Sequence, residues 1–170
     1  MPVISKTAAD PSAVLALARA WIGTPYLHQA SVKGVGSDCL GLARGIWRGL
    51  HVSEPFDLPP YSRDWGEVGT REVLLEAARA HLIETPVGNA GPGTLILFRM
   101  EPAAPAKHCG VLGASVIQPS LIHAYDRSGV VEEPLSAFWA RRATFAFLFP
   151  APTLSQPAPA KAASEASGAT

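Results

Sequence analysis

The sequence predicts an α+β fold in which helices come first along the chain and an antiparallel sheet follows. Two observations predict it. Apolar residues with helical spacing dominate the chain up to about residue 82. From Thr94 onward, short aliphatic and aromatic segments alternate with turn residues, as strands do. Helices followed by a run of strands are typical of α+β domains whose sheet is antiparallel.

The composition excludes several classes of protein. The chain has 170 residues, of which 48% are hydrophobic and 16% charged, and these values are typical of one globular domain. Fourteen basic residues balance fourteen acidic ones, so we expect no nucleic-acid partner, because no positive field is available to hold a phosphate backbone. No apolar run reaches the roughly 18 residues of a membrane-spanning helix, so we expect no membrane insertion.

We expect one domain over residues 1–150 and a disordered tail over residues 151–170, because the tail consists mainly of proline, alanine and serine. The apolar stretch "VLALARAW" near the N-terminus is short and contains Arg19, so we expect synthesis in the cytoplasm without a Sec signal. Two cysteines are too few for a disulfide framework, and we expect both to stay reduced there.

The first helix is expected from about residue 10 to Ile22, because Asp10 and Pro11 form a cap and first-turn pair. Its expected buried face consists of Val14, Leu15, Ala18 and Ile22.

The second helix should begin at Ser37 or Asp38, either of which can cap it, and end at Gly49. Residues 50–69 contain prolines and little periodicity, which predicts an irregular excursion over the surface. A third helix is expected over about 71–82. The five segments predicted as strands are "TLILFR" (94–99), "HCGVLGA" (108–114), "SLIHAY" (120–125), "GVVEE" (129–133) and "TFAFLF" (144–149).

Cys39 is the first candidate for chemistry, because it lies just inside the start of the second helix. Unpaired backbone N–H groups at a helix N-terminus favour a thiolate over a thiol and lower the pKa of the cysteine. The residues three, four and seven positions beyond Cys39 are apolar, so this face should pack against the domain. The alternative is that Cys39 is a small buried hydrophobe, which is common for a free cysteine.

His108 and His123 are the second candidates. The stretch between them can fold as a hairpin centred between Ser115 and Val116, which would place the two histidines directly opposite each other. One imidazole could then orient the other, and Cys109 would face the opposite side of the sheet as a packing residue. The alternative for each histidine is an ordinary core or surface position.

These segments together resemble the NlpC/P60 family of papain-like cysteine peptidases, and more closely its members from phage tails and gene transfer agents. The stretches that carry the resemblance are "GTPYLHQ", "SDCLGLARGIW", "GPGTLILFR", "HCGVL" and "LIHAY", in this order over about residues 10–150. The resemblance implies a fold in which the cysteine helix packs on an antiparallel sheet that carries the histidines.

The resemblance also implies a role for each matching residue. Cys39 would be the nucleophile, His108 the general base and then general acid, and His123 the group that fixes the tautomer of His108. Tyr26 would lie near the oxyanion site, where the backbone N–H of Cys39 also donates. Asp38 matches an aspartate that binds polar groups of the substrate.

The implied function is thiol-dependent hydrolysis of amide bonds in peptidoglycan stem peptides, at the bond between D-glutamate and a diamino acid. No cofactor or metal is expected. The protein would reach the cell wall in a phage-tail-like or gene-transfer-agent particle, or after lysis, so particle proteins are expected partners. Leu40 departs from many relatives that trim free peptides, which have serine there.

Three alternatives stay open. The chain can be a catalytically inactive structural module of a tail tip with the same fold. A zinc site built from Cys39, His108, Cys109 and His123 is a weaker alternative, since tight pairs such as C-x-x-C are absent. The insertion at 50–91 can form a wall or cover of the cleft, or it can simply pack on the surface.

Overall fold

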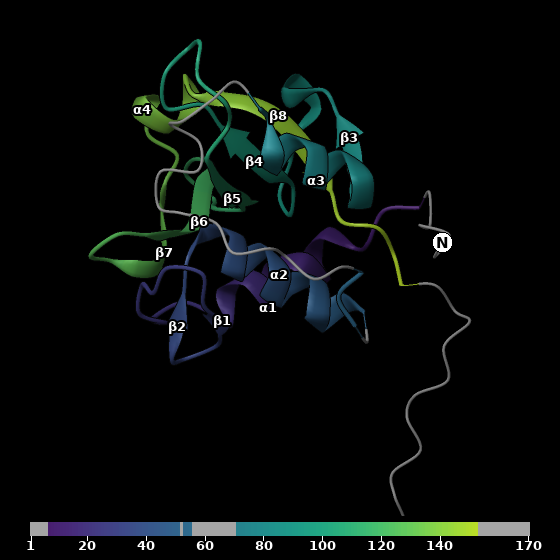
Figure 1. The fold of residues 1–170 in the computed structure, drawn as a ribbon, viewed down its shortest axis with the longest axis vertical. Coiled ribbons are helices and arrows are strands. Elements are labelled where there is room, and N and C mark those ends of the chain that lie inside the picture. The colour runs from purple at the N-terminus through teal and green to yellow at the C-terminus, as the bar shows by residue number, and fades with distance from the viewer. Residues whose placement is uncertain (1–6, 52, 56–70, 153–170) are drawn as a thin grey trace, which may run out of the picture.

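The computed structural model describes residues 7–51, 53–55 and 71–152, and within them it confirms the predicted α+β fold with helices packed on an antiparallel sheet (Figure 1). The main sheet has six strands in the order β3-β8-β4-β5-β6-β7, and β1 and β2 form a separate pair. The strands are β1 (Ser31–Val32), β2 (Gly36–Ser37), β3 (Ile83–Thr85), β4 (Leu95–Phe98), β5 (His108–Gly113), β6 (Ser120–Tyr125), β7 (Gly129–Pro134) and β8 (Ala143–Leu148).

Helix α1 (Pro11–Arg19) begins as predicted, because the side chain of Asp10 accepts a hydrogen bond from the backbone N–H of Ser12. The helix ends at Arg19, so the predicted extension to Ile22 is wrong. The chain turns tightly after α1, and the helical spacing therefore no longer applies there. As a result Ile22 is 45% exposed, and Trp21 enters the core in its place.

Helix α2 (Cys39–Leu50) begins directly after Asp38, whose side chain accepts from the backbone N–H of Gly41. The predicted apolar face is buried, with Leu42 and Ile46 at its centre. Helix α3 (Val73–His81) lies beside β3 (Figure 1) and adds Leu74, Leu75 and Ala78 to the same core.

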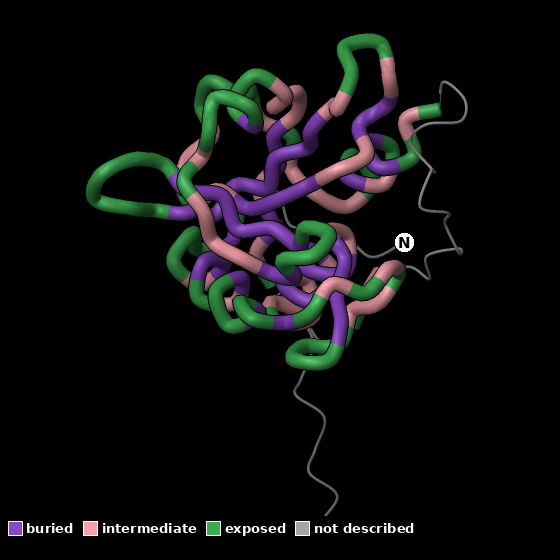
Figure 2. The backbone as a smooth tube through the Cα atoms, turned by 90° about the vertical axis from the view of Figure 1, so that its left-hand side faces the viewer, coloured by how far each residue is buried: buried purple, intermediate pink, exposed green. Residues whose placement is uncertain are grey.

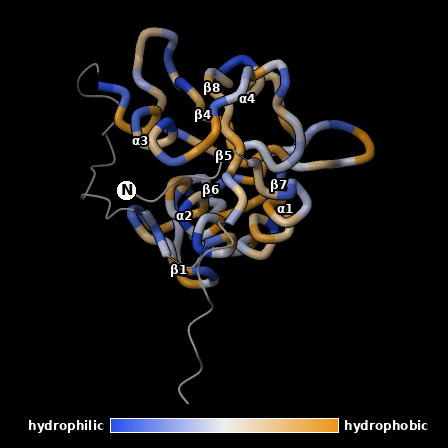
Figure 3. Tube along the Cα trace, turned by 90° about the vertical axis from the view of Figure 1, so that its right-hand side faces the viewer, coloured by the Kyte–Doolittle hydropathy of each residue, from blue (hydrophilic) through white to orange (hydrophobic). Residues whose placement is uncertain are grey.

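The sheet has a core on each face. The larger core lies between one face and helices α1, α2 and α3. The smaller core covers the other face, where Trp139 of the short helix α4 (Ala137–Ala140) packs with Ile96, Phe98 and Leu121. Buried residues therefore concentrate in the strands and turns remain exposed (Figure 2), and the strands at the centre are correspondingly hydrophobic (Figure 3).

All five predicted strands are present, but the 50–91 segment contains structure that the sequence analysis did not predict. Strand β3 pairs antiparallel with β8, and a short 3-10 helix spans Val87–Asn89. Three residues are too few for a periodic pattern to reveal a strand. Most of the predicted excursion, at residues 56–70, and most of the predicted tail, at 153–170, lie outside the described residues. No helix in the described ranges is long and apolar enough to cross a membrane.

The predicted register of the β5–β6 hairpin is wrong by two residues. Val111 pairs with Ile122 and Leu112 with Leu121, so His108 and His123 are not directly opposite each other. A shift by an even number keeps every side chain on its predicted face, because side chains alternate along a strand. Gly110 takes the place opposite His123, and a Cβ atom there would lie 2.9 Å from the Cβ of His123. The two histidines are thus diagonal neighbours on one face.

Candidate active site

A cleft opens at the N-terminus of α2 and contains four of the five predicted site residues. The cleft has a volume of about 160 Å³. The fifth residue, His123, is only 1% exposed and lies behind His108. The cleft is lined by Tyr26, His28, Asp38, Cys39, Leu40, Lys107, His108, Ala124, Tyr125 and Asp126.

Cys39 is the first residue of α2 and is half-buried, so its thiol is accessible from the cleft. Hydrogen bonds from the thiol of Cys109 and from His108 hold the pKa of Cys39 well below its usual range, although burial opposes them. The positive end of the α2 dipole acts in the same direction. The structure therefore combines access with stabilisation of the thiolate.

Cys109 lies closer to Cys39 than the sequence analysis anticipated. It is fully buried, as expected for a packing residue, but its thiol donates to the backbone carbonyl of Cys39 over 3.3 Å. The hydrogen bond to Cys39, together with burial, raises the pKa of Cys109. The pKa values of the two thiols are thus shifted in opposite directions. Of these two cysteines, Cys39 is the one suited to be a nucleophile.

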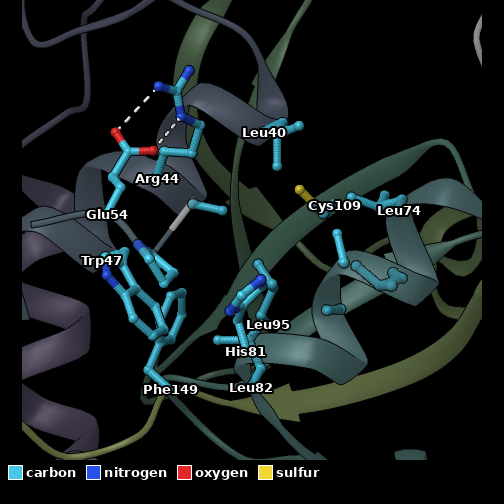
Figure 4. A pocket seen from close by; sticks show the side chains of 15 residues that line it. Leu40, Arg44, Trp47, Glu54, Leu74, His81, Leu82, Leu95, Cys109 and Phe149 are labelled. Carbon is cyan, nitrogen blue, oxygen red and sulfur yellow. Dashed lines mark hydrogen bonds and ion pairs between the residues drawn. The ribbon is translucent and has the colours of Figure 1, made fainter. Parts of the chain in front are cut away.

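A second, apolar pocket lies behind the cleft, between α2, α3 and the sheet. The sulfur of Cys109 faces it beside Leu40 and Leu74 (Figure 4). The guanidinium of Arg44 closes one side through its bond to Glu54, with Nε and Oε2 separated by 2.7 Å. Among the described residues that line this pocket, Cys109 is the one cysteine.

The two histidines form a hydrogen-bonded pair in spite of the shifted register. The Nε2 atom of His108 lies 2.8 Å from Nδ1 of His123. On the far side of His123, Nε2 lies 3.0 Å from Oε1 of Glu133. Burial, followed by the charge of His108, lowers the pKa of His123 to about 4, so this ring is neutral at neutral pH.

Trp139 fixes the geometry of this pair from the smaller core. Its indole stacks on the ring of His108, with centroids 4.8 Å apart and an angle of 25° between the planes. Its Nε1–H donates to the same Glu133 oxygen over 3.0 Å.

Glu133 was not among the predicted site residues. It pairs with Leu121 across β6 and β7, and so shares a face with His123. The alternation in "GVVEEP" could have placed it there once the pairing of β7 with β6 was known.

Asp38 lies in the cleft wall and is only 3% exposed. One carboxylate oxygen accepts from the backbone N–H of Gly41 and the other from that of Gln29, each over 2.7 Å. Nδ1 of His28 lies 3.7 Å from the second oxygen. The contacts of Asp38 within the chain therefore hold the start of α2 against the preceding loop, and its contact with substrate stays a prediction.

Tyr26 lines the same cleft as Cys39, and its place near an oxyanion site stays a prediction. Its backbone forms a parallel bridge to Ser37, two residues before the nucleophile. The loop that carries Tyr26 is thus fixed to the helix start. Among the described residues, no group of three or more His, Cys, Asp and Glu side chains is arranged to hold a metal ion.

The fold is similar to that of solved NlpC/P60 domains. The NlpC/P60 domain of the peptidoglycan hydrolase SagA is 20% identical to this chain at a TM-score of 0.52, over 82% of this chain and 98% of that one. An NlpC/P60 family protein from Bacillus cereus ATCC 10987 is 17% identical at a TM-score of 0.54, over 82% of this chain and 40% of its own. A lipoprotein-like NLP/P60 family protein from Staphylococcus aureus is 18% identical at a TM-score of 0.53, over 87% of this chain and 44% of its own.

The fold of this chain is therefore that of NlpC/P60 domains, and this chain spans less than half the length of two of the three matched chains. A scan of the sequence against family models finds no match, and a search of curated proteins finds none. The site adds a cysteine at a helix N-terminus, a histidine hydrogen-bonded to it and a second histidine bonded to the first. This combination can perform nucleophilic catalysis on a carbonyl.

Proposed function

We propose that this protein is a cysteine peptidase that hydrolyses amide bonds in peptidoglycan stem peptides. The observation that carries the proposal is the half-exposed thiol of Cys39 at a helix N-terminus, hydrogen-bonded to His108, which is in turn bonded to His123. The shared fold supports the choice of substrate, because one of the matched structures is the NlpC/P60 domain of a peptidoglycan hydrolase.

In the proposed mechanism the thiolate of Cys39 attacks the scissile carbonyl carbon. The backbone N–H of Cys39 at the start of α2 and the side chain of Tyr26 stabilise the oxyanion. His108 then donates its proton to the leaving amine and a thioacyl-enzyme remains. A water molecule that loses its proton to His108 attacks the thioester and releases the acid product.

We propose the amide between D-glutamate and a diamino acid as the bond cleaved. Both sides of that bond carry charged groups, and the cleft presents both signs of charge, with Lys107 against carboxylates and Asp126 against amines. Leu40 adds an apolar surface beside the nucleophile where a hydroxyl would suit a free amine. Binding of substrate polar groups by Asp38 is part of the same proposal.

The expected association with a phage-tail-like or gene-transfer-agent particle depends on the resemblance of the sequence alone. We propose it as the route by which a cytoplasmically made protein reaches the cell wall. Co-purification of the protein with such particles, followed by mass spectrometry, is the test.

The activity itself is tested by incubating purified protein with peptidoglycan and identifying the released muropeptides by mass spectrometry. The proposal expects new D-glutamyl-terminated products, and it expects Cys39→Ala to reduce their formation by at least about 100-fold, because covalent catalysis then has no nucleophile. The thermal midpoint of the variant should stay within a few degrees of wild type. Wild-type protein without turnover would favour the inactive structural module, and full turnover by Cys39→Ala would refute the assigned nucleophile.

A further inference from the structure

We propose that Glu133 is a positioning residue that sets the direction of a proton chain running through His123 and His108 to Cys39. This inference deepens the proposed function and rests on it for the catalytic consequence, but the chain of hydrogen bonds can be tested separately. Glu133 lies on β7. It forms the end of the hydrogen-bonded series that is farthest from Cys39.

The contacts determine where each proton lies. The carboxylate of Glu133 accepts hydrogen bonds, and it receives one from Trp139 and one from His123, both at Oε1. His123 is buried and neutral, so it carries a single ring proton, and that proton is on Nε2. Its Nδ1 atom must then accept, and the proton between the two rings belongs to Nε2 of His108.

This arrangement leaves Nδ1 of His108 for the hydrogen bond to Cys39. Nδ1 can take the proton of the thiol and later return it to the leaving amine, while Nε2–H stays bonded to His123. If His123 carried its proton on Nδ1 instead, it would donate to Nε2 of His108. The neutral His108 ring would then hold its proton on Nδ1 and could not act as a base toward Cys39.

The residues around the hydrogen-bonded histidine pair support a specific role for Glu133. Its side chain is 44% exposed, whereas the His123 side chain that it contacts is 1% exposed. The titratable groups that face the two rings are Cys39 from α2, Tyr125 from β6 and Glu133 from β7, with Lys107 next to His108 in the cleft. Of these, only Glu133 contacts the Nε2 atom of His123 in the described residues.

The adjacent residue provides a matched control. Glu132 lies on the same strand and binds Arg19, with Oε1 and NH2 2.8 Å apart, and the hydroxyl of Ser120. Its side chain therefore faces away from the histidine pair. Glu132→Gln removes one carboxylate charge from β7 without touching the proton chain.

The first readout is the tautomer of His123, measured by nitrogen-15 NMR of histidine-labelled full-length protein at pH 7. The proposal expects the Nε2–H tautomer in wild type and in Glu132→Gln. It expects a mixture, or the Nδ1–H tautomer, in Glu133→Ala. Glu133→Gln should retain the Nε2–H tautomer, because the amide oxygen can still accept from both ring systems. A wild-type His123 protonated on Nδ1 would overturn the proposal, even if Glu133→Ala failed to fold.

The second readout is hydrolysis of muropeptides. We expect kcat of Glu133→Ala to fall by at least about tenfold with little change in KM, because the base is misprotonated in part of the population. Glu133→Gln should recover most of that loss. Unchanged kcat and an unchanged tautomer in Glu133→Ala would refute the role of Glu133 while Cys39→Ala still tests the activity. If wild type shows no turnover, the proposed function fails, and the NMR result alone decides the proton chain.

Discussion

The two cysteines of this chain lie in contact but have opposite chemical environments. Cys39 receives hydrogen bonds that favour the thiolate, while Cys109 donates one and is sealed in the core. Cys109 also does more than fill the core, because its thiol donates a hydrogen bond to the backbone carbonyl of Cys39.

At the scale of single residues, the sequence singled out residues that the structure brings together, but it did not predict all of their contacts. Cys39, His108 and His123 could be singled out because a helix start and strand alternation place them by local rules. Glu133 and the Cys39–Cys109 contact could not, because each depends on how separate elements pair in space. No local pattern encodes that pairing.

The buried, neutral state of His123 predicts a specific loss of stability in acid. Its pKa is about 4 in the folded protein and ordinarily near 6.5, so the unfolded chain binds more protons between these values. The contribution of His123 to the free energy of unfolding should thus be fully present above pH 6.5 and should be lost as the pH falls toward 4. The shift corresponds to a loss on the order of 3 kcal/mol.

Urea unfolding at several pH values measures this loss. His123→Asn, which cannot titrate, is the control and should lack that part of the pH dependence, while the histidines outside the His108–His123 pair are the same in both proteins. Parallel curves for the two proteins between pH 6.5 and 4 would contradict the assigned state of His123.

Among the elements, helix α2 is the most important for the site, because its first residue is the proposed nucleophile Cys39 and its cap is Asp38. Removing the cap with Asp38→Ala should cost about 1 to 2 kcal/mol of unfolding free energy and leave N–H groups of α2 unpaired. We also expect activity to fall, since the loop that carries Gln29 loses its bond to the helix start. Urea unfolding and muropeptide assays measure the two effects.

Asp10→Ala is the matched control for this prediction. Asp10 caps α1 in the same way, at an exposed position away from the cleft. Its loss should reduce stability by a similar or smaller amount and leave turnover per folded molecule unchanged. Equal effects of both substitutions on turnover would show that the cap at Asp38 has no special role in the site.

The strand register shows where prediction from local pattern stops. The strands themselves were predictable from composition and turns, and the faces from alternation. The register was not, because any even shift of β5 against β6 buries the same side chains. The observed pairing places Gly110 opposite His123, and a Cβ atom at Gly110 would lie within 3 Å of side-chain atoms of Leu121 and His123.

In the whole molecule, the site lies where the two cores meet at the end of the sheet. Helix α2 brings the thiol from the larger core, and β5, β6, β7 and α4 bring the two histidines, Glu133 and Trp139 from the smaller one. The layer order could be predicted from the order of helices and strands along the chain. The joining of the two cores through a hydrogen-bonded chain depends on tertiary packing, which the sequence pattern does not specify.

The reactivity of Cys39 as a function of pH tests this account most directly. Full-length protein is alkylated with iodoacetamide between pH 4 and 10, and each cysteine is followed by peptide mass spectrometry. The account predicts that Cys39 reacts with a midpoint well below the value of about 8.5 for a free thiol, and that buried Cys109 reacts far more slowly. A midpoint for Cys39 at or above 8.5, or equal slow rates for both cysteines, would contradict it.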